Sequence, residues 1–249
     1  MLTRRGGRHA AALAALAALT FTSCGGGSST PATERSKRAY EPRIRPADFG
    51  GPVDNPYFPL VPGSRWIYEG TQKAGTERTV VEVTRDTKAI LGVTTVVVHD
   101  TVSTAGAVKE DTFDWYAQDR KGNVWYFGED TKEYENGVVV NTEGSWEAGV
   151  DGAKAGIIMK ARPGSGAAYR QEHYRGHAED FAQVLSKVDS VTVPAGSYHD
   201  VLETKEFTPL EPKLVEHKYY ARGVGVVREV TVRGGSDRTQ LVEYTPGPG

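Results

Sequence analysis

Acidic side chains gather around the most aromatic stretch of the chain, residues 112–140, and paired carboxylates are the groups that hydrolyse glycosidic bonds. Carboxylates beside exposed aromatic rings could also bind a sugar without cleaving it. The spacing in this stretch fixes no separation between two carboxyls, and charged residues are equally typical of the turns and edges of a solvated sheet. Both sugar chemistry and a plain sheet surface therefore stay open. The acidic candidates are Glu110, Asp111, Asp114, Asp119, Glu129, Asp130, Glu133 and Glu135.

Other reactive residue types are present without the spacing that their chemistry needs. His173 and His177 are four residues apart and could bind zinc on a helix, but the Tyr-Arg-Gly between them is typical of a strand end or turn. Asp119 and Asn123 lack the alternating oxygen ligands of a calcium loop. The chain has no G-x-S-x-G elbow for a serine nucleophile. We expect no catalytic residue, no metal and no cofactor, and we predict that the protein is not an enzyme.

Aromatic side chains are the remaining candidates for binding. All of them can be core residues, because large aromatic side chains are normally buried. The sharper hypothesis is that some of them line a cavity in a curved sheet, with the long Gly- and Ala-rich segment 142–163 as a lid. The candidate ligand-binding residues are Trp66, Tyr68, Trp115, Trp125, Phe127 and Trp146.

The elements that must position these residues are β-strands. Apolar and polar residues alternate in short runs that are broken by turn signals, of which Asn136-Gly137 is the clearest hairpin turn. About eleven such runs occur, and segment 178–185, which also fits a helix face, is predicted as a strand because strands flank it. We predict an all-β fold with few or no helices. It is an antiparallel curved sheet, either a barrel or a half-barrel of the lipocalin-like kind.

The start of the folded domain is rich in proline. Pro56, Pro59 and Pro62 surround Tyr57 and Phe58, and prolines at this density do not sit in a central strand. We therefore expect an extended lead-in that lays aromatic rings over an edge of the core. One domain, residues 53–249, is predicted from this point onward.

The first 52 residues are set apart from that domain. Three arginines, a twelve-residue apolar run too short to span a bilayer, and small residues precede Cys24, the single cysteine. This pattern resembles a bacterial lipoprotein signal, which implies that residues 1–23 are removed and that Cys24 carries lipid. Residues 24–52 are predicted to be a flexible tether, and its basic residues either lie on anionic headgroups or only keep the linker soluble.

Charge limits the partners of the exported chain. Without the three arginines of the signal, 27 of the 30 basic residues remain against 32 acidic ones. A net negative chain lacks the concentrated positive surface that nucleic acid requires. With its one cysteine lipidated, the domain has no disulfide, so its core alone must hold it together.

Three segments resemble bacterial envelope lipoproteins with no established activity. They read YFPLVPGSRWIYEG, SVTVPAGSYHDVLET and YYARGVGVVREV, and the central DWYAQDRKGNVWYFGEDTKEYENG is similar to a lipoprotein group of high-GC bacteria. The resemblance implies a fold like the curved sheets of lipoprotein carriers, and it brings no catalytic residue.

Together these features predict a lipid-anchored β protein on the extracytoplasmic face of a bacterial membrane. The leading hypothesis is a noncatalytic protein that holds an apolar or amphipathic ligand inside its curved sheet. The alternative is a surface module that contacts glycan or another envelope protein through exposed aromatic rings. The first requires an enclosed cavity, whereas the second requires Trp or Tyr rings on an open face.

Overall fold

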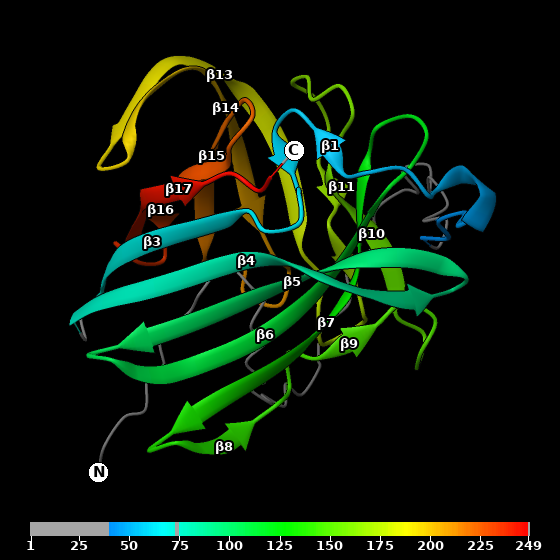
Figure 1. Ribbon diagram of the computed structural model, residues 1–249, viewed down its shortest axis with the longest axis horizontal. Coiled ribbons are helices and arrows are strands. Elements are labelled where there is room, and N and C mark those ends of the chain that lie inside the picture. The colour runs from blue at the N-terminus through cyan, green and yellow to red at the C-terminus, as the bar shows by residue number, and fades with distance from the viewer. Residues whose placement is uncertain (1–39, 73–74, 249) are drawn as a thin grey trace, which may run out of the picture.

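The computed structural model describes residues 40–72 and 75–248, and nearly all of their regular structure is β-strand (Figure 1). The one helical element among them is a 3-10 turn, η1 (Pro46–Asp48). The first strands are β1 (Asp54–Asn55), β2 (Phe58–Pro59), β3 (Arg65–Gln72), β4 (Gly75–Ile90), β5 (Val93–Thr104), β6 (Ala107–Gln118), β7 (Val124–Glu135) and β8 (Val138–Asn141). They are followed by β9 (Trp146–Glu147), β10 (Lys154–Met159), β11 (Tyr169–Arg170), β12 (Glu172–His173), β13 (Phe181–Val193), β14 (Gly196–Phe207), β15 (Val215–Ala221), β16 (Gly225–Arg233) and β17 (Arg238–Thr245).

All strands except the β1–β2 pair belong to one antiparallel sheet. Its order is β11-β13-β14-β15-β16-β17-β3-β4-β5-β6-β7-β10-β12, and β8 and β9 pair with β7 beside this path. Most neighbours are consecutive hairpins, as the turn signals predict. Asn136 and Gly137 both have positive φ, 53° and 78°, which is the conformation of a type I′ turn. The prediction of an all-β, antiparallel curved sheet is confirmed, and of its two forms the open half-barrel is the one found (Figure 1).

The two edges of the curled sheet are held together by one short extended segment. Its first half, β11, pairs with β13 at one edge, and its second half, β12, pairs with β10 at the other. Gln171 alone separates the halves, and its backbone N–H donates to the carbonyl of Asp180 at 2.8 Å. We call residues 169–173 the edge staple. It brings the edges together without a continuous ladder, so the sheet curls but does not become a barrel.

Segment 142–163, expected to be a lid, is part of the sheet. Its strands β9 and β10 both pair with β7, and Met159 is fully buried. The expectation of a lid is wrong because β9 and β10 fix the segment to β7. Gly149 and Gly152 make turns with positive φ, whereas Gly156 allows close packing. A Cβ on Gly156 would stand 2.2 Å from the carbonyl oxygen of Gln171 in the edge staple. Glycine at this position is what lets β10 and the staple approach each other.

The predicted strand over residues 178–185 is found as the start of β13, which begins at Phe181 and continues to Val193. The N-terminal boundary differs from the expected one. Residues 40–52 pack on the sheet instead of forming the end of a free tether. The Phe49 ring contacts Phe127, with centroids 5.7 Å apart, and the Tyr40 hydroxyl donates to the carbonyl of Ala155.

The edge staple can be tested at Gly156. Gly156→Ala forces a Cβ against the backbone of Gln171, so we expect it to lower the free energy of unfolding by about 2 kcal/mol or more. Gly166→Ala is the matched control, because Gly166 has open space around its Cα. Urea unfolding followed by tryptophan fluorescence measures both variants. Equal stability of the two would show that the close approach is not a structural requirement.

Candidate functional site

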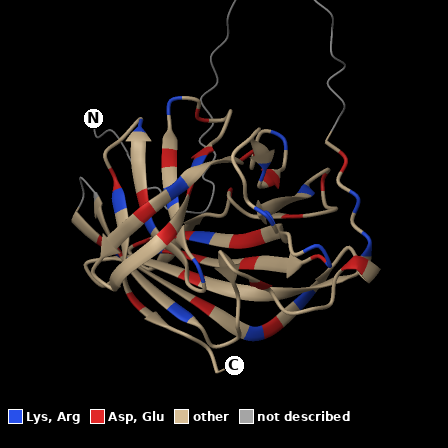
Figure 2. Ribbon diagram, turned by 90° about the horizontal axis from the view of Figure 1, so that it is seen from above, with Lys and Arg blue, Asp and Glu red and all other residues tan. Residues whose placement is uncertain are grey.

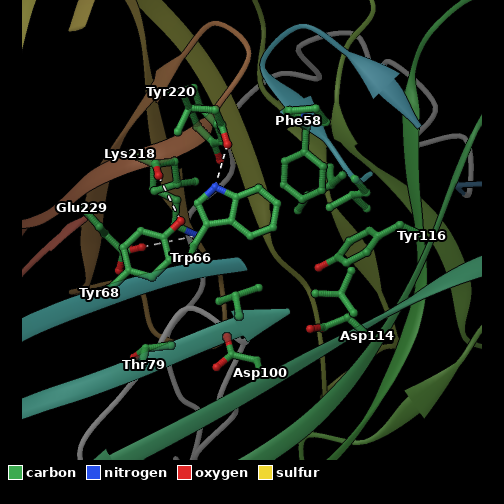
Figure 3. Close-up of a pocket in the computed structure, with 18 of the residues that line it drawn as sticks. Phe58, Trp66, Tyr68, Thr79, Asp100, Asp114, Tyr116, Lys218, Tyr220 and Glu229 are labelled. Atoms are coloured by element: carbon green, nitrogen blue, oxygen red, sulfur yellow. Dashed lines mark hydrogen bonds and ion pairs between the residues drawn. The ribbon is translucent and has the colours of Figure 1, made fainter. Parts of the chain in front are cut away.

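A cavity of about 160 Å³ lies inside the curved sheet and has an apolar side and a charged side (Figure 3). Its apolar wall is made by Phe58, Leu60, Trp66, Tyr116 and Ile158. The charged side is made of residues that each project from a different strand of the inner face. These residues are Asp100 of β5, Asp114 of β6, Lys218 of β15 and Glu229 of β16.

The proline-rich lead-in forms the roof of this cavity, as the prediction of an aromatic-bearing extended segment anticipates. The Phe58 ring meets the Tyr116 ring edge-on, with centroids 5.3 Å apart. Asn55 is 2% exposed and donates through Nδ2 to the carbonyls of Gly122 and Lys160. At the other end, the backbone N–H of Gly223 donates to the carbonyl of Pro56 at 2.7 Å. The roof is therefore tied to both sides of the curled sheet.

Trp66 and Tyr68 line the cavity from β3, where alternate residues share a face. Trp66 Nε1 donates to the carbonyl of Val224 at 2.8 Å, and the Tyr68 hydroxyl donates to that of Val226 at 3.0 Å. The Trp66 ring also stacks on Tyr244. Burial raises the pKa of Tyr68, so its hydroxyl stays a donor. Both rings are held in place by hydrogen bonds while their faces border the cavity.

Lys218 is neutralised by carboxylates of the adjacent strands. Its Nζ lies 2.7 Å from Glu206 of β14 and 3.6 Å from Glu229 of β16. Burial alone would lower the pKa of Lys218, but these two carboxylates outweigh it and hold the pKa well above its usual range. The ammonium is therefore charged, and both of its carboxylate contacts are to residues of the sheet.

Asp100 and Asp114 stand on the other side of the cavity. Asp100 pairs in register with Thr112, two residues before Asp114, so the two carboxyls share the inner face of neighbouring strands. Asp114 is 8% exposed and accepts a hydrogen bond from the Tyr126 hydroxyl. Burial raises the pKa of Asp114 to about 6, although the hydrogen bonds from Tyr126 and Tyr116 act to lower it.

The Asp100 carboxyl is less well satisfied than that of Asp114. Its Oδ1 is shielded from solvent and has no hydrogen-bond partner among the described residues. Burial, and then the nearby Asp114, Glu110 and Glu77, raise the pKa of Asp100 well above its usual range. An acceptor with raised basicity therefore borders the cavity.

More carboxyls continue along the inner face beyond the cavity. Glu77 of β4 and Glu110 of β6 both have the pKa raised to about 7, mainly by burial. Burial raises the pKa of Glu129 of β7 and of Glu172 of β12 well above the usual range. Glu172 and Asp114 add to the shift of Glu129, and Asp180 and Asp114 add to that of Glu172. Elsewhere acidic and basic residues are interspersed along the strands (Figure 2). We call Glu77, Asp100, Glu110, Asp114, Glu129 and Glu172 the inner carboxyls.

The structure divides the eight acidic candidates between different places. Glu110, Asp114 and Glu129 are inner carboxyls. Asp111 points to the opposite face and pairs with His99 at 2.6 Å, and Asp130 pairs with Lys132 at 2.9 Å. Asp119 holds a turn together by accepting hydrogen bonds from the backbone of Lys121 and the side chains of Asn123 and Trp125. Glu133 and Glu135 lie toward the β7–β8 hairpin.

Three inner carboxyls, Glu77, Asp100 and Glu172, were not anticipated from the sequence. For Asp100 a signal exists. It lies between Val98 and Val102, which are both buried and share its face of β5. An acidic residue at an alternate position of an apolar strand face marks a buried carboxyl. Glu172 offers no such signal, because β12 is two residues long and its burial follows from the edge staple.

The other four aromatic candidates lie outside the cavity. Trp115 is covered by the Lys88 ammonium, 3.3 Å from its ring centroid, and Trp125 and Phe127 pack against Phe49. Trp146 meets the Tyr126 ring edge-on. Every Trp, Tyr and Phe side chain that the structure describes is buried or half-buried.

The histidine pair does not converge on one point. The His173 ring meets Tyr40 edge-on at 5.3 Å between centroids, whereas His177 stacks on Tyr174. In the described part of the chain, no group of three or more His, Cys, Asp or Glu side chains is placed to hold a metal ion. Residues 1–23, Cys24 and the tether up to residue 39 lie outside the described residues. Within residues 40–72 and 75–248, no helix is both long and apolar enough to cross a bilayer.

Comparison with known proteins yields two solved structures. No family model matches the chain, and no curated protein matches it. A Bacteroides fragilis protein, provisionally described as exported with a YmcC-like fold, has 15% identity and a TM-score of 0.43, over 76% of this chain and 99% of its own. A Parabacteroides distasonis protein, provisionally described as a lipoprotein, has 14% identity and a TM-score of 0.42, over 76% of this chain and 98% of its own. Neither source supports the high-GC origin that the resemblance implied.

The inner carboxyls, together with the buried Glu216 of β15, give the protein a testable pH dependence. The pKa is raised to about 7 in Glu77 and Glu110, to about 6 in Asp114 and to about 8 in Glu216. Their stabilising contribution is complete below the unfolded-state values and is lost as the pH rises through these raised ones. We expect the free energy of unfolding to fall by several kcal/mol from about pH 5 to about pH 8, because each unit of pKa difference corresponds to about 1.4 kcal/mol. His173 opposes this trend, because burial lowers its pKa, but it is one group against four.

Glu110→Gln removes one of these groups and should flatten the pH dependence of unfolding while stabilising the protein at the alkaline end. Glu143→Gln, at an exposed position, should leave the profile unchanged. Urea unfolding at a series of pH values measures both. A wild-type stability that is constant or rises across this range would contradict the burial of protonated carboxyls.

Proposed function

We propose that this chain is an exported, membrane-anchored lipoprotein that binds an apolar or amphipathic small molecule in the cavity of its curved sheet, without catalysis. The observation that carries the proposal is the cavity itself, with its apolar wall and its charged side. Small-molecule sites are typically concave and apolar, with few polar groups that fix orientation. The anchor and the export are supported by the signal-like start of the sequence and by Cys24.

The size of the cavity limits what it can hold. A protein cavity of roughly 150 Å³ is large enough to take up benzene. The 160 Å³ found here therefore suits one ring or one short alkyl group, with the rest of the molecule outside or under the roof. We propose an amphipathic molecule of which only the end enters the sheet.

A noncatalytic role agrees best with the arrangement of the carboxyls. Asp100 and Asp114 lie side by side on neighbouring strands, and Glu229, the carboxyl across the cavity, is already paired with Lys218. A hydrolase needs two available carboxyls on opposite sides of the bond that it cleaves. The alternative of a surface module that uses exposed aromatic rings has less support. It needs an open aromatic face, and the aromatic side chains that the structure describes are buried or half-buried.

Binding can be measured with a neutral fluorescent probe, N-phenyl-1-naphthylamine, added to the chain from residue 24 onward with Cys24→Ser. We expect its fluorescence to rise on binding. Val81→Phe fills the cavity from β4 and should weaken binding by about tenfold or more, because the added ring occupies the same space.

Val108→Phe is the matched control. It makes the same change at a residue that is 41% exposed and lies outside the cavity, so it should leave the affinity unchanged. If the probe does not bind to the wild type, or binds to Val81→Phe as it does to the wild type, the cavity is not the binding site.

A further inference from the structure

We infer that the charged side of the cavity selects a ligand with a protonated amine, held by the carboxyl of Asp100, while the ligand's ring or short alkyl end packs on Trp66 and Phe58. This inference rests on the proposed function and narrows it to one chemical class. An organic monocation with an apolar end is the expected occupant, and apolar molecules with an acidic group are the expected non-ligands.

The first support is the balance of charge among the residues that line the cavity. Lys218 is the one basic side chain among the described lining residues, and it is already paired with Glu206 and Glu229. No basic group remains opposite Asp100 and Asp114 in this lining. Charges in an interior are stabilised mainly by opposite charges and hydrogen bonds, so a cation that displaces the proton of Asp100 would meet a carboxylate there and no basic group of the lining.

The second support is the hydrogen-bonding state of the two aspartates. Asp114 is satisfied by the Tyr126 hydroxyl, whereas Asp100 Oδ1 is shielded from solvent and has no partner among the described residues. Buried acceptors are nearly always hydrogen-bonded in folded proteins. An ammonium group that enters the cavity beside Asp100 would bring three N–H donors and a positive charge to a carboxyl that is short of hydrogen bonds.

The third support is the aromatic composition of the wall. Phe58, Trp66, Tyr68 and Tyr116 all border the cavity, and the faces of aromatic rings attract cations. An anion would instead meet Asp100, Asp114 and Glu229, and the one ammonium in the lining, that of Lys218, is already shared between two carboxylates. The same wall that accepts an apolar group therefore favours a cation beside it.

Binding of an amine should be coupled to release of a proton. The groups nearest to Asp100 are mostly acidic: Glu77 from β4, Glu110, Asp111 and Asp114 from β6, and the phenols of Tyr68 and Tyr116, with Lys218 and Glu229 across the cavity. Together with burial, they raise the pKa of Asp100, so the free protein holds a proton there. A cation must displace this proton, and its affinity should therefore increase with pH.

The test compares three ligands of one chain length as competitors of N-phenyl-1-naphthylamine: hexylamine, hexanol and hexanoate. We expect hexylamine to displace the probe at about tenfold lower concentration than hexanol, and hexanoate to be the weakest, because a charge-assisted hydrogen bond to a buried carboxylate is stronger than a neutral one. The advantage of hexylamine over hexanol should increase from about pH 5 to about pH 8.

Asp100→Asn should abolish the preference for hexylamine over hexanol while the probe affinity stays within about twofold, since the apolar wall is unchanged. Asp130→Asn is the control. It removes a carboxylate from the face of β7 opposite to the cavity, so the preference for hexylamine over hexanol should remain. If the probe binds and hexanoate competes as well as hexylamine, or if Asp100→Asn keeps the preference, this inference is overturned and the proposed function stands. If neither the probe nor any of the three ligands binds, both fall. If Asp100→Asn does not fold, the order in which the three ligands displace the probe from the wild type decides the test.

Discussion

Burial of charge on the inner face of a curled sheet is the constraint on which the rest of this structure depends. An unpaired buried charge is expensive, so each charged group inside the sheet must be paired or neutral. Lys218 meets the requirement by pairing with Glu206 and Glu229, and these contacts tie three neighbouring strands together. Glu77, Glu110 and Asp100 meet it differently, because burial raises their pKa values and so favours the protonated, neutral carboxyl. The cavity lies where this acidic surface meets the aromatic wall.

The inner face exists only because the sheet curls, and the curl depends on the edge staple. Residues 169–173 pair with β13 on one side and β10 on the other, across a single intervening glutamine. The proline-rich roof then spans the opening from Gly122 to Gly223. The edge staple, which joins the two edges of the sheet, also places Glu172 among the inner carboxyls. The curl of the sheet and the acidity of its inner face therefore depend on the same segment.

Local features of the fold could be predicted from the sequence because strands and turns are encoded locally. Alternation of apolar and polar residues predicted the strands, and Asn136-Gly137 predicted its hairpin turn. The two-residue spacing of Trp66 and Tyr68 predicted that both rings lie on one face of the strand. Pairing between distant segments could not be predicted in the same way. The edge staple, the packing of residues 40–52 on β7 and the inclusion of segment 142–163 in the sheet all depend on contacts far apart in the chain.

The candidate site was predicted in part for the same reason. Trp66 and Tyr68 follow from the pattern of a single strand, whereas Phe58 and Tyr116 were not among the candidates. The charged side is assembled from strands β5, β6, β15 and β16. Asp100 could have been recognised as buried from its valine neighbours two positions away on either side. Its proximity to Asp114, and the pairing of Lys218, depend on register between strands, which one sequence does not reveal.

Native mass spectrometry of the chain purified from its own host tests the central claim most directly. The account predicts a noncovalent adduct that is lost on denaturation, and a released small molecule with an apolar end and an amine nitrogen. A chain that carries no adduct, and that takes up no added amphiphile of any charge, would contradict the account.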